Sequence, residues 1–221
     1  MPDASGLASG LEAAPPKPDH GGTFRALVGD RLWRTLPLEV QQRFGRELSG
    51  SERALYRGEV LFTHRTLVGR LWAQLLRIVG APLPLESFSR IASTVVVTSG
   101  DRAGTQCWTR SYELPGGKSQ IIRSTKSFTG PTGLEELVGA GLSMALTVSV
   151  ESCALVFRSA GYYWQWGDGR LSVPTWLTPG QITVRHQEEY ADRFSFSLTV
   201  DHPWLGRLIH QVALFQDAGD E

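Results

Sequence analysis

Titratable and cationic side chains recur in phase with apolar residues on several predicted strands. The residues concerned are His64, Arg110, His186, Glu188 and His210. Successive side chains of a strand point to opposite faces, so a polar residue that shares the parity of apolar neighbours is expected to point into the core. An imidazole there could act as a general base near neutral pH, and the arginine could meet the polar end of a ligand. The pattern predicts a polar group of side chains inside the folded domain.

Each of these residues belongs to a run of alternate positions. The sets predicted to face inward are Tyr56, Val60, Phe62 and His64; Trp108, Arg110, Tyr112 and Leu114; Ile182, Val184, His186, Glu188 and Tyr190; and Leu208, His210, Val212 and Leu214. Burying such groups costs several kcal/mol unless they are paired, so they should form a network or meet a ligand. His186 and Glu188 are separated by about 7 Å along one strand face, which is close enough for a shared ligand or a bridging water. The alternatives are a purely structural network, or strand ends that have already left the core.

Aromatic residues that carry a polar group gather in one predicted hairpin. Trp164, Trp166 and Trp176 occur in this hairpin with Tyr162 and Tyr163, and such residues commonly line ligand cavities or interfaces. Trp108 lies on another of the inward-facing runs. We therefore expect Trp108, Trp164 and Trp166 to contribute to ligand binding, with the filling of a wide core as the alternative.

The sequence has no signature of a metal, nucleotide or serine-nucleophile site. Residues 186–190 read HQEEY rather than HExxH, and the histidines have no ligand spacing. Serines occur in GLSMA and GKSQI rather than GxSxG, and GAG at 139–141 lacks the third glycine of a dinucleotide fingerprint. The two cysteines, Cys107 and Cys153, form no CxxC pair and are interpreted as small buried hydrophobes. We predict no cofactor and no metal.

The composition is that of an ordinary globular chain. Among 221 residues, 22 Lys+Arg balance 22 Asp+Glu, so there is no basic field to attract a nucleic acid partner. Residues 1–22 lack the apolar core of a signal peptide, and the longest uncharged stretch, 137–150, is too short to span a bilayer. We expect a disordered leader at 1–22, a single domain at 23–217, a tail at 218–221, and a cytoplasmic protein without a membrane span.

The elements that must position these residues are mainly antiparallel strands. Short amphipathic helices are expected at 23–36 and 38–46, a strand at 53–65, and a long helix at 67–79. Strands joined by short turns follow, apart from one helical turn expected at 134–138, and the last three strands lie at about 181–190, 194–201 and 207–216. About eight to ten strands without helical crossovers predict an α+β protein, mostly antiparallel β, in which a curled meander forms a barrel or half-barrel. Lipocalin-like and fatty-acid-binding barrels are the nearest architectural analogies.

Five longer motifs resemble a known family. They are FRALVGDRLWRTLPLEVQQRF at 24–44, YRGEV at 56–60, WTR at 108–110, VPTWLTPG at 173–180 and DHPWLGRL at 201–208. Together they resemble the uncharacterised bacterial family called domain of unknown function 4166, over about residues 24–216. Members of that family occur alone or fused behind NAD(P)-binding domains similar to saccharopine dehydrogenase, which implies an accessory or substrate-handling role beside an oxidoreductase. The final strand of the family usually carries a tyrosine and a glycine, where this chain has His210, Gln211 and Val212.

Three functions follow from these observations. The first, which we favour, is a non-enzymatic binding domain that holds a small hydrophobic or amphipathic molecule inside the curled sheet. The second is an accessory or protein-interaction module for an NAD(P)-dependent oxidoreductase, which predicts a filled interior and an exposed aromatic patch. The third is an enzyme that uses His186 or His210 as a general base, which predicts two titratable groups within hydrogen-bond reach beside a cavity.

Overall fold

A computed structural model of the protein describes residues 23–78, 89–102, 104–166, 169–190 and 192–219. The predicted leader at 1–22 lies outside these residues. The described residues form eleven antiparallel strands, ten of which close into a barrel. The strands are β1 (Arg53–Arg65), β2 (Ile91–Ser99), β3 (Thr105–Leu114), β4 (Lys118–Ser127), β5 (Glu135–Gly139), β6 (Leu142–Glu151), β7 (Ala154–Trp166), β8 (Gly169–Ser172), β9 (Gln181–Glu188), β10 (Arg193–His202) and β11 (Gly206–Asp217). Their order is β6-β5-β4-β3-β2-β1-β11-β10-β9-β7, and β7 also pairs with β6 to complete the ring, while β8 pairs with β7 alone. The predicted antiparallel barrel is confirmed.

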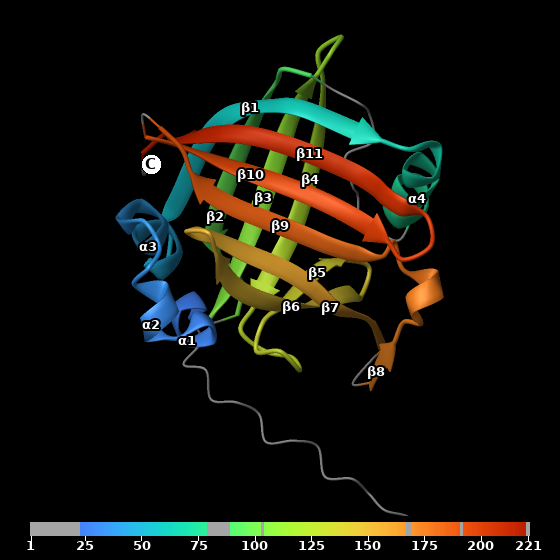
Figure 1. Cartoon of the computed structure of the whole chain (residues 1–221), viewed down its shortest axis with the longest axis horizontal. Helices are drawn as coiled ribbons and strands as arrows, with labels where there is room; N and C mark the ends of the chain where they lie inside the picture. The colour runs from blue at the N-terminus through green and yellow to red at the C-terminus, as the bar shows by residue number, and fades with distance from the viewer. Residues whose placement is uncertain (1–22, 79–88, 103, 167–168, 191, 220–221) are drawn as a thin grey trace, which may run out of the picture.

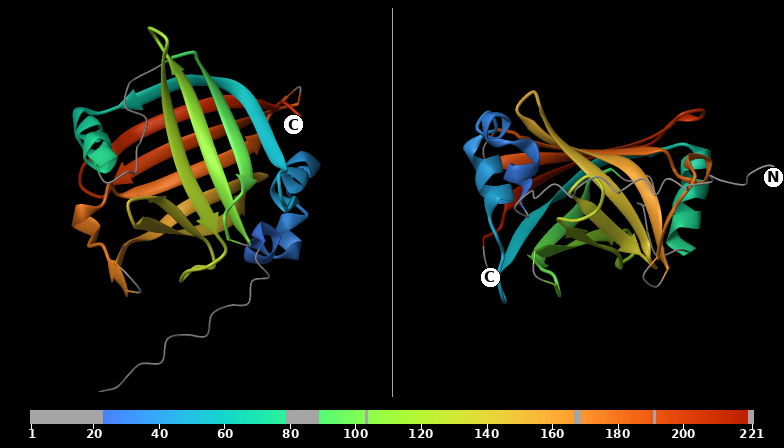
Figure 2. Two further views of the ribbon diagram at one scale, coloured as in Figure 1. Left: turned by 180° about the vertical axis from the view of Figure 1, so that it is seen from behind. Right: turned by 90° about the horizontal axis from the view of Figure 1, so that it is seen from below.

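The barrel is flattened into two layers that face each other. In Figure 1, β1, β11, β10 and β9 cross the front of the molecule, and β2, β3 and β4 run behind them in a steeply different direction. Figure 2 shows the same layers from behind and from below. Alternate side chains of both layers meet between them, as in any closed sheet, and form one continuous hydrophobic core.

Short helices lie at the two ends of the barrel. At one end, called here the α3 end, are α1 (Phe24–Val28), α2 (Asp30–Trp33) and α3 (Leu38–Gly45). At the other, the α4 end, are α4 (Leu67–Ile78) and the 3-10 helix η1 (Thr175–Leu177). Thr23 caps α1 by accepting a hydrogen bond from the Ala26 N–H at 3.2 Å. The predicted helix at 23–36 is split at Gly29, whose φ of 85° takes the chain out of helical geometry.

A β-bulge in β1 overturns the inward placement of His64. The register of β1 against β11 shifts between Val60 and Phe62, and an extra residue of this kind exchanges the two faces of a strand. Tyr56 and Val60 are buried inside as predicted, but beyond the bulge the buried residues are at odd positions, and His64 is exposed. The prediction that Phe62 and His64 face the interior is therefore wrong.

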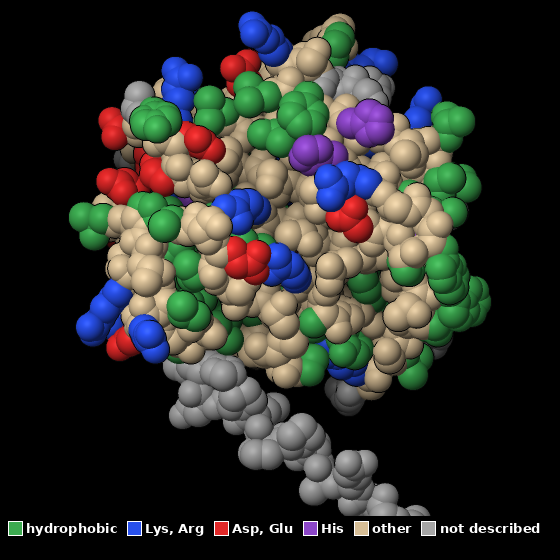
Figure 3. Space-filling model, viewed as in Figure 1, with side chains coloured by type: hydrophobic (Ala, Val, Ile, Leu, Met, Phe, Trp, Pro, Cys, Tyr) green, Lys and Arg blue, Asp and Glu red, His purple; other side chains and the backbone are tan. Residues whose placement is uncertain are grey.

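The predicted face of β11 is wrong as well. Gln211 and the odd-numbered residues that follow it line the interior, so His210 points outward, where its ring lies 5.0 Å from that of Phe62. Histidine side chains are visible on this outer surface in Figure 3. Leu208 is buried beside the start of α4, where the Thr66 N–H donates to its carbonyl oxygen at 3.1 Å. Leu208 is therefore buried against the start of α4 and does not face the barrel interior.

Two further details differ between expectation and structure. Residues 134–138 were expected to form a helical turn, but Glu135–Gly139 is a strand that pairs with both β4 and β6. The turn expected after Glu151 is present at Ser152 and Cys153, both of which have positive φ. Cys153 is exposed there and Cys107 is half-buried, so the two cysteines are not the buried residues that we expected.

Candidate functional site

The barrel encloses a cavity of about 180 Å³. Apolar side chains from both layers make up most of its wall, among them Val95, Leu146, Phe157, Val184, Phe196 and Phe215. Phe44 of α3 reaches the cavity from the α3 end. The interior is thus neither filled completely nor uniformly polar, and it could hold a small apolar group.

Three charged side chains from adjacent strands meet in the wall of this cavity. They are Arg110 of β3, Lys126 of β4 and Glu136 of β5. The Lys126 Nζ lies 3.0 Å from the Glu136 Oε1, and the Arg110 Nη2 lies 3.9 Å from the same oxygen. Lys126 and Glu136 are buried, whereas the Arg110 side chain is 28% exposed. We call these three residues the charged cluster.

The charged cluster carries one more positive than negative group. Burial alone would raise the pKa of the Glu136 carboxyl, but the charges of Lys126 and Arg110, with a hydrogen bond from Ser124, lower that pKa to about 2. Burial lowers the pKa of the Lys126 ammonium, and the Glu136 carboxylate partly offsets this effect. Glu136 is therefore ionised at neutral pH, and an anion entering the cavity would meet two cations and one carboxylate.

Trp108 forms the floor under the two cations. It is buried and lines the cavity, with the Lys126 Nζ 4.7 Å and the Arg110 Cζ 5.7 Å from its ring centroid. Both distances are within the range of cation–π attraction. The Trp108 Nε1–H donates to the Gln106 Oε1 at 3.3 Å. The ring thus holds the positive groups on one side of the cavity.

His186 and Glu188 form a separate cluster at the α3 end. The Arg43 Nη1 of α3 lies 2.9 Å from the His186 Nε2 and 3.0 Å from the Glu188 Oε2. A guanidinium can only donate, so the His186 Nε2 accepts and the ring proton is on Nδ1. The His186 ring is also surrounded by those of Phe44 and Phe194, both with centroids 4.9 Å away.

His186 is held in its neutral form. Burial, followed by the nearby Arg43 charge, lowers the pKa of His186 well below its usual range. Its Nδ1 is buried, with no hydrogen-bond partner among the described residues. The lone pair of Nε2 is engaged by Arg43, Nδ1 carries the ring proton, and His186 is not among the residues that line the cavity. This imidazole therefore has neither a free lone pair nor the position of a general base for that cavity.

The structure brings together only part of the predicted site. Trp108 and Arg110 line the cavity. Trp164 is half-buried on β7 and is not among the lining residues, and the side chain of Trp166 lies outside the described part of the structure.

Lys126 and Glu136 are functional candidates that the sequence reasoning missed. Lys126 has the parity of Ile122 and Ser124 on one strand, so the rule that identified Arg110 would also have identified Lys126. Glu136 was missed because its segment was expected to form a helical turn.

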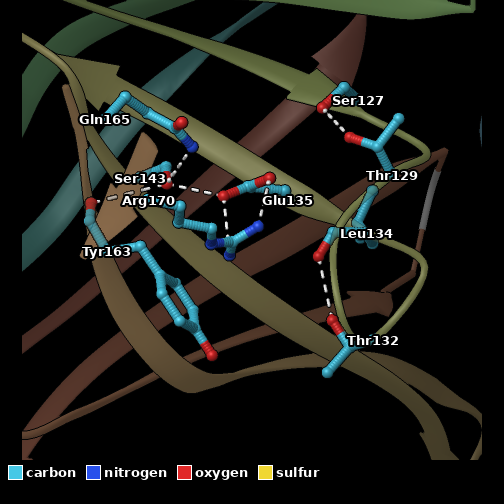
Figure 4. Close-up of polar contacts among 9 residues, drawn as sticks. All are labelled: Ser127, Thr129, Thr132, Leu134, Glu135, Ser143, Tyr163, Gln165 and Arg170. Atoms are coloured by element: carbon cyan, nitrogen blue, oxygen red, sulfur yellow. Dashed lines mark hydrogen bonds and ion pairs between the residues drawn. The ribbon is translucent and has the colours of Figure 1, made fainter. Parts of the chain in front are cut away.

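Glu135, next to Glu136, points to the opposite face and organises a second polar cluster (Figure 4). Its Oε1 accepts a 2.5 Å hydrogen bond from the Ser143 Oγ and lies 2.9 Å from the Arg170 Nη2. The Gln165 Nε2 donates to the Ser143 Oγ at 3.4 Å. These contacts join β5, β6, β7 and β8, and the Ser143 hydroxyl donates its hydrogen bond to the Glu135 carboxylate rather than to an imidazole. The cluster fixes β8 to the barrel and does not have the geometry of an activated serine.

No group of three His, Cys, Asp or Glu side chains in the described part of the chain is placed to hold a metal ion. The described helices also lack the length and apolar character that crossing a bilayer would require.

Comparison with models of protein families places this chain in a family. The family model described as "Domain of unknown function (DUF4166)" matches residues 36–215, which include the barrel strands, α3 and the charged cluster. The comparison with curated proteins finds no match. Since the family model covers most of the chain and all three residues of the charged cluster, the chain belongs to the family described as Domain of unknown function (DUF4166).

Proposed function

We propose that the protein binds a small carboxylic acid with an apolar body in the barrel cavity, without catalysing a reaction. The single observation that carries this proposal is the charged cluster in a mostly apolar wall. A ligand with an apolar body and an anionic head would satisfy both parts of the cavity at once.

Arg110 is the group best placed to receive the anionic head. Its Nη1 donates to the Ser124 Oγ at 3.2 Å, and its Nη2 lies 3.9 Å from the nearest Glu136 oxygen, which is beyond hydrogen-bond length. A guanidinium has five N–H donors arranged to bind a carboxylate with two parallel hydrogen bonds. Arg110 therefore keeps donors for an incoming acid, and its partial exposure lets water reach them before binding.

The size of the cavity limits the apolar body. A cavity of about 150 Å³ lined by apolar side chains binds benzene, and the cavity here measures about 180 Å³. The natural fit is thus an acid of roughly ten non-hydrogen atoms, the size of one aromatic ring with a carboxylate. A long fatty acid would need Phe44 and α3 to move.

The accessory-module and enzyme hypotheses receive less support. The accessory-module hypothesis predicted an exposed aromatic patch, which Trp176 and Trp204 provide, but also a filled interior, whereas the barrel contains a cavity. The enzyme hypothesis predicted two titratable groups within hydrogen-bond reach beside a cavity, which Lys126 and Glu136 provide at 3.0 Å. It also needed His186 or His210 as the general base, and neither is among the residues that line the cavity.

Calorimetry with benzoate and with benzyl alcohol, its neutral analogue, tests the proposal. We expect benzoate to bind and benzyl alcohol to bind at least about tenfold more weakly, because a hydrogen bond to a charged group contributes about 1.5–3 kcal/mol. Arg110→Met should weaken benzoate binding about ten- to hundredfold, whereas Arg31→Met, a change at an exposed arginine of α2, should leave it unchanged. Equal affinity for the acid and the alcohol, or an unaffected Arg110→Met variant, would overturn the proposal.

Native mass spectrometry of freshly purified protein gives an independent measurement. An adduct with the mass of a small acid, lost in Arg110→Met and kept in Arg31→Met, would identify the natural ligand class.

A further inference from the structure

Large apolar side chains are exposed together at the α4 end of the barrel. We define the end patch as Leu67, Leu71, Trp176, Leu177, Trp204 and Leu205, all of them exposed. Trp204 is 76% exposed and Trp176 is 61% exposed, which is unusual for the residue type with the largest apolar surface. Such a concentration of exposed apolar side chains indicates a surface that meets another phase or partner.

The segments that carry the end patch are neighbours in space. The β10–β11 turn that carries Trp204 follows β10 directly, and the Trp204 N–H donates to the His202 Nδ1 at 3.3 Å. Gly180, just after η1, approaches so closely that a Cβ there would lie 2.4 Å from the Asp201 carbonyl oxygen. At the start of α4, the Thr66 N–H donates to the Leu208 carbonyl oxygen. Figures 1 and 2 place α4, this turn and η1 at the same end of the barrel, and hydrophobic side chains line that edge in Figure 3.

The charged residues in these segments are nearly all basic. Segments 65–72, 169–178 and 201–208 contain four arginines but only one acidic residue, Asp201. Asp201 is paired with Arg207 at 3.0 Å, Arg170 is paired with Glu135 at 2.9 Å, and Arg65 is buried. Arg70 is exposed within the first turn of α4, between Leu67 and Leu71. The end patch is therefore apolar with a small excess of positive charge, which Arg70 carries at the surface and which is complementary to an anionic surface.

We propose that the end patch docks the barrel on the surface of an anionic lipid bilayer. Tryptophan prefers the boundary between headgroups and acyl chains, where its ring is buried and its N–H stays hydrated. Leucine side chains beside it enter the acyl region, and Arg70 keeps its charged end at the phosphates. A protein partner would be recognised equally well by the apolar residues, but exposed tryptophans and leucines beside the positive charge of Arg70 favour the lipid surface.

The biological use of this membrane docking rests on the proposed function, the binding of a small carboxylic acid. A carboxylic acid with an apolar body partitions into membranes, and a barrel seated on the bilayer would collect or release such a ligand there. The two proposals are nevertheless separate in structure, because the charged cluster and the end patch share no residue.

Vesicle co-sedimentation tests the docking with the full chain. Vesicles of phosphatidylcholine mixed with phosphatidylglycerol should bind the protein, whereas vesicles of phosphatidylcholine alone should bind it at least about tenfold less, and added salt should weaken the binding. A Trp176→Ala, Trp204→Ala double variant should lose at least about tenfold in partitioning, because two exposed indoles no longer enter the interface. Arg70→Glu should reduce binding to the anionic vesicles alone.

Tyr190→Ala is the matched control, since Tyr190 is an aromatic residue that is 94% exposed at the α3 end. It should bind vesicles like the wild type, and thermal unfolding should show that all variants are folded. Benzoate binding in the absence of vesicles should be unchanged in the double variant, and vesicle binding should be unchanged in Arg110→Met, which separates failure of one proposal from failure of the other.

The docking proposal is overturned if the anionic vesicles do not bind, or if Tyr190→Ala loses as much binding as the double variant. Self-association in sedimentation velocity that the double variant abolishes, without vesicle binding, would instead assign the end patch to a second copy of this chain and also overturn it.

Discussion

Replacing Phe44 by alanine would test how α3 closes the cavity. The Phe44 ring is buried, and its centroid lies 4.9 Å from that of His186, 5.4 Å from Phe24, 5.8 Å from Phe157 and 6.3 Å from Trp108. Removing a buried phenylalanine ring costs about 3–5 kcal/mol in the free energy of unfolding. Each aromatic pair adds about 0.5–1.5 kcal/mol beyond area burial, so four partners place the expected loss in the upper half of that range.

Guanidinium denaturation measures this loss, and the binding of acids of different size measures its effect on the cavity. Phe44→Ala should enlarge the cavity, so 2-naphthoate should gain affinity relative to benzoate. Phe44→Leu, which removes less volume, should cost about 1–2 kcal/mol and keeps the test open if the alanine variant does not fold. Leu38→Ala, on the exposed side of the same helix, should change stability by less than about 0.5 kcal/mol. A loss below about 1 kcal/mol for Phe44→Ala, comparable with that of Leu38→Ala, would refute the role of Phe44 as a packed closure.

Three further outcomes are expected. Its neighbours lower the pKa of Glu136 from its ordinary value of 4.5 to about 2 in the folded protein, so the ionised carboxylate contributes about 3 kcal/mol to the free energy of unfolding, present above pH ~4.5 and lost as the pH falls toward ~2. Urea denaturation across this range should show a shallower loss of stability in acid for Glu136→Gln. Gly58→Ala should prevent normal folding, because its Cβ would lie 2.0 Å from a carbonyl oxygen of β11, whereas Gly45→Ala, with a nearest contact of 3.6 Å, should fold normally by circular dichroism. NMR of the His186 ring should show no titration between pH ~5 and ~8 and a proton on Nδ1; a midpoint near 6.5 would contradict the lowered pKa, and a proton on Nε2 in the neutral ring would contradict the assigned tautomer.

The strand pattern predicted the barrel, but not which face of every strand is inside. Alternation holds within an uninterrupted strand, so Trp108 and Arg110 were placed correctly on β3. The bulge between Val60 and Phe62 leaves no mark in the sequence, since both faces of β1 carry apolar residues. One inserted residue therefore moved His64 from the predicted interior to the surface.

The charged cluster shows a second limit of prediction from the sequence. Lys126 was within reach of the parity rule, but a lysine in a strand is usually solvated, and only the structure shows that Glu136 offsets its burial. The partnership of Arg43 with His186 joins residues 143 positions apart, and such a pairing depends on how α3 seats at the barrel end. Local patterns carry no information about it.

The pairing of β1 with β11 has a consequence for biosynthesis. Tyr56 is opposite Asp217, so one edge of β1 stays unpaired until the ribosome has made the final strand. At about 5–20 residues per second, this delay lasts roughly 10–30 seconds. During that time the edge of the nascent strand is open to another partner, but Arg57 and Glu59 place charges on its outward face, and charged side chains on an edge strand disfavour edge-to-edge aggregation. These two side chains are thus suited to limiting aggregation of the unfinished polypeptide.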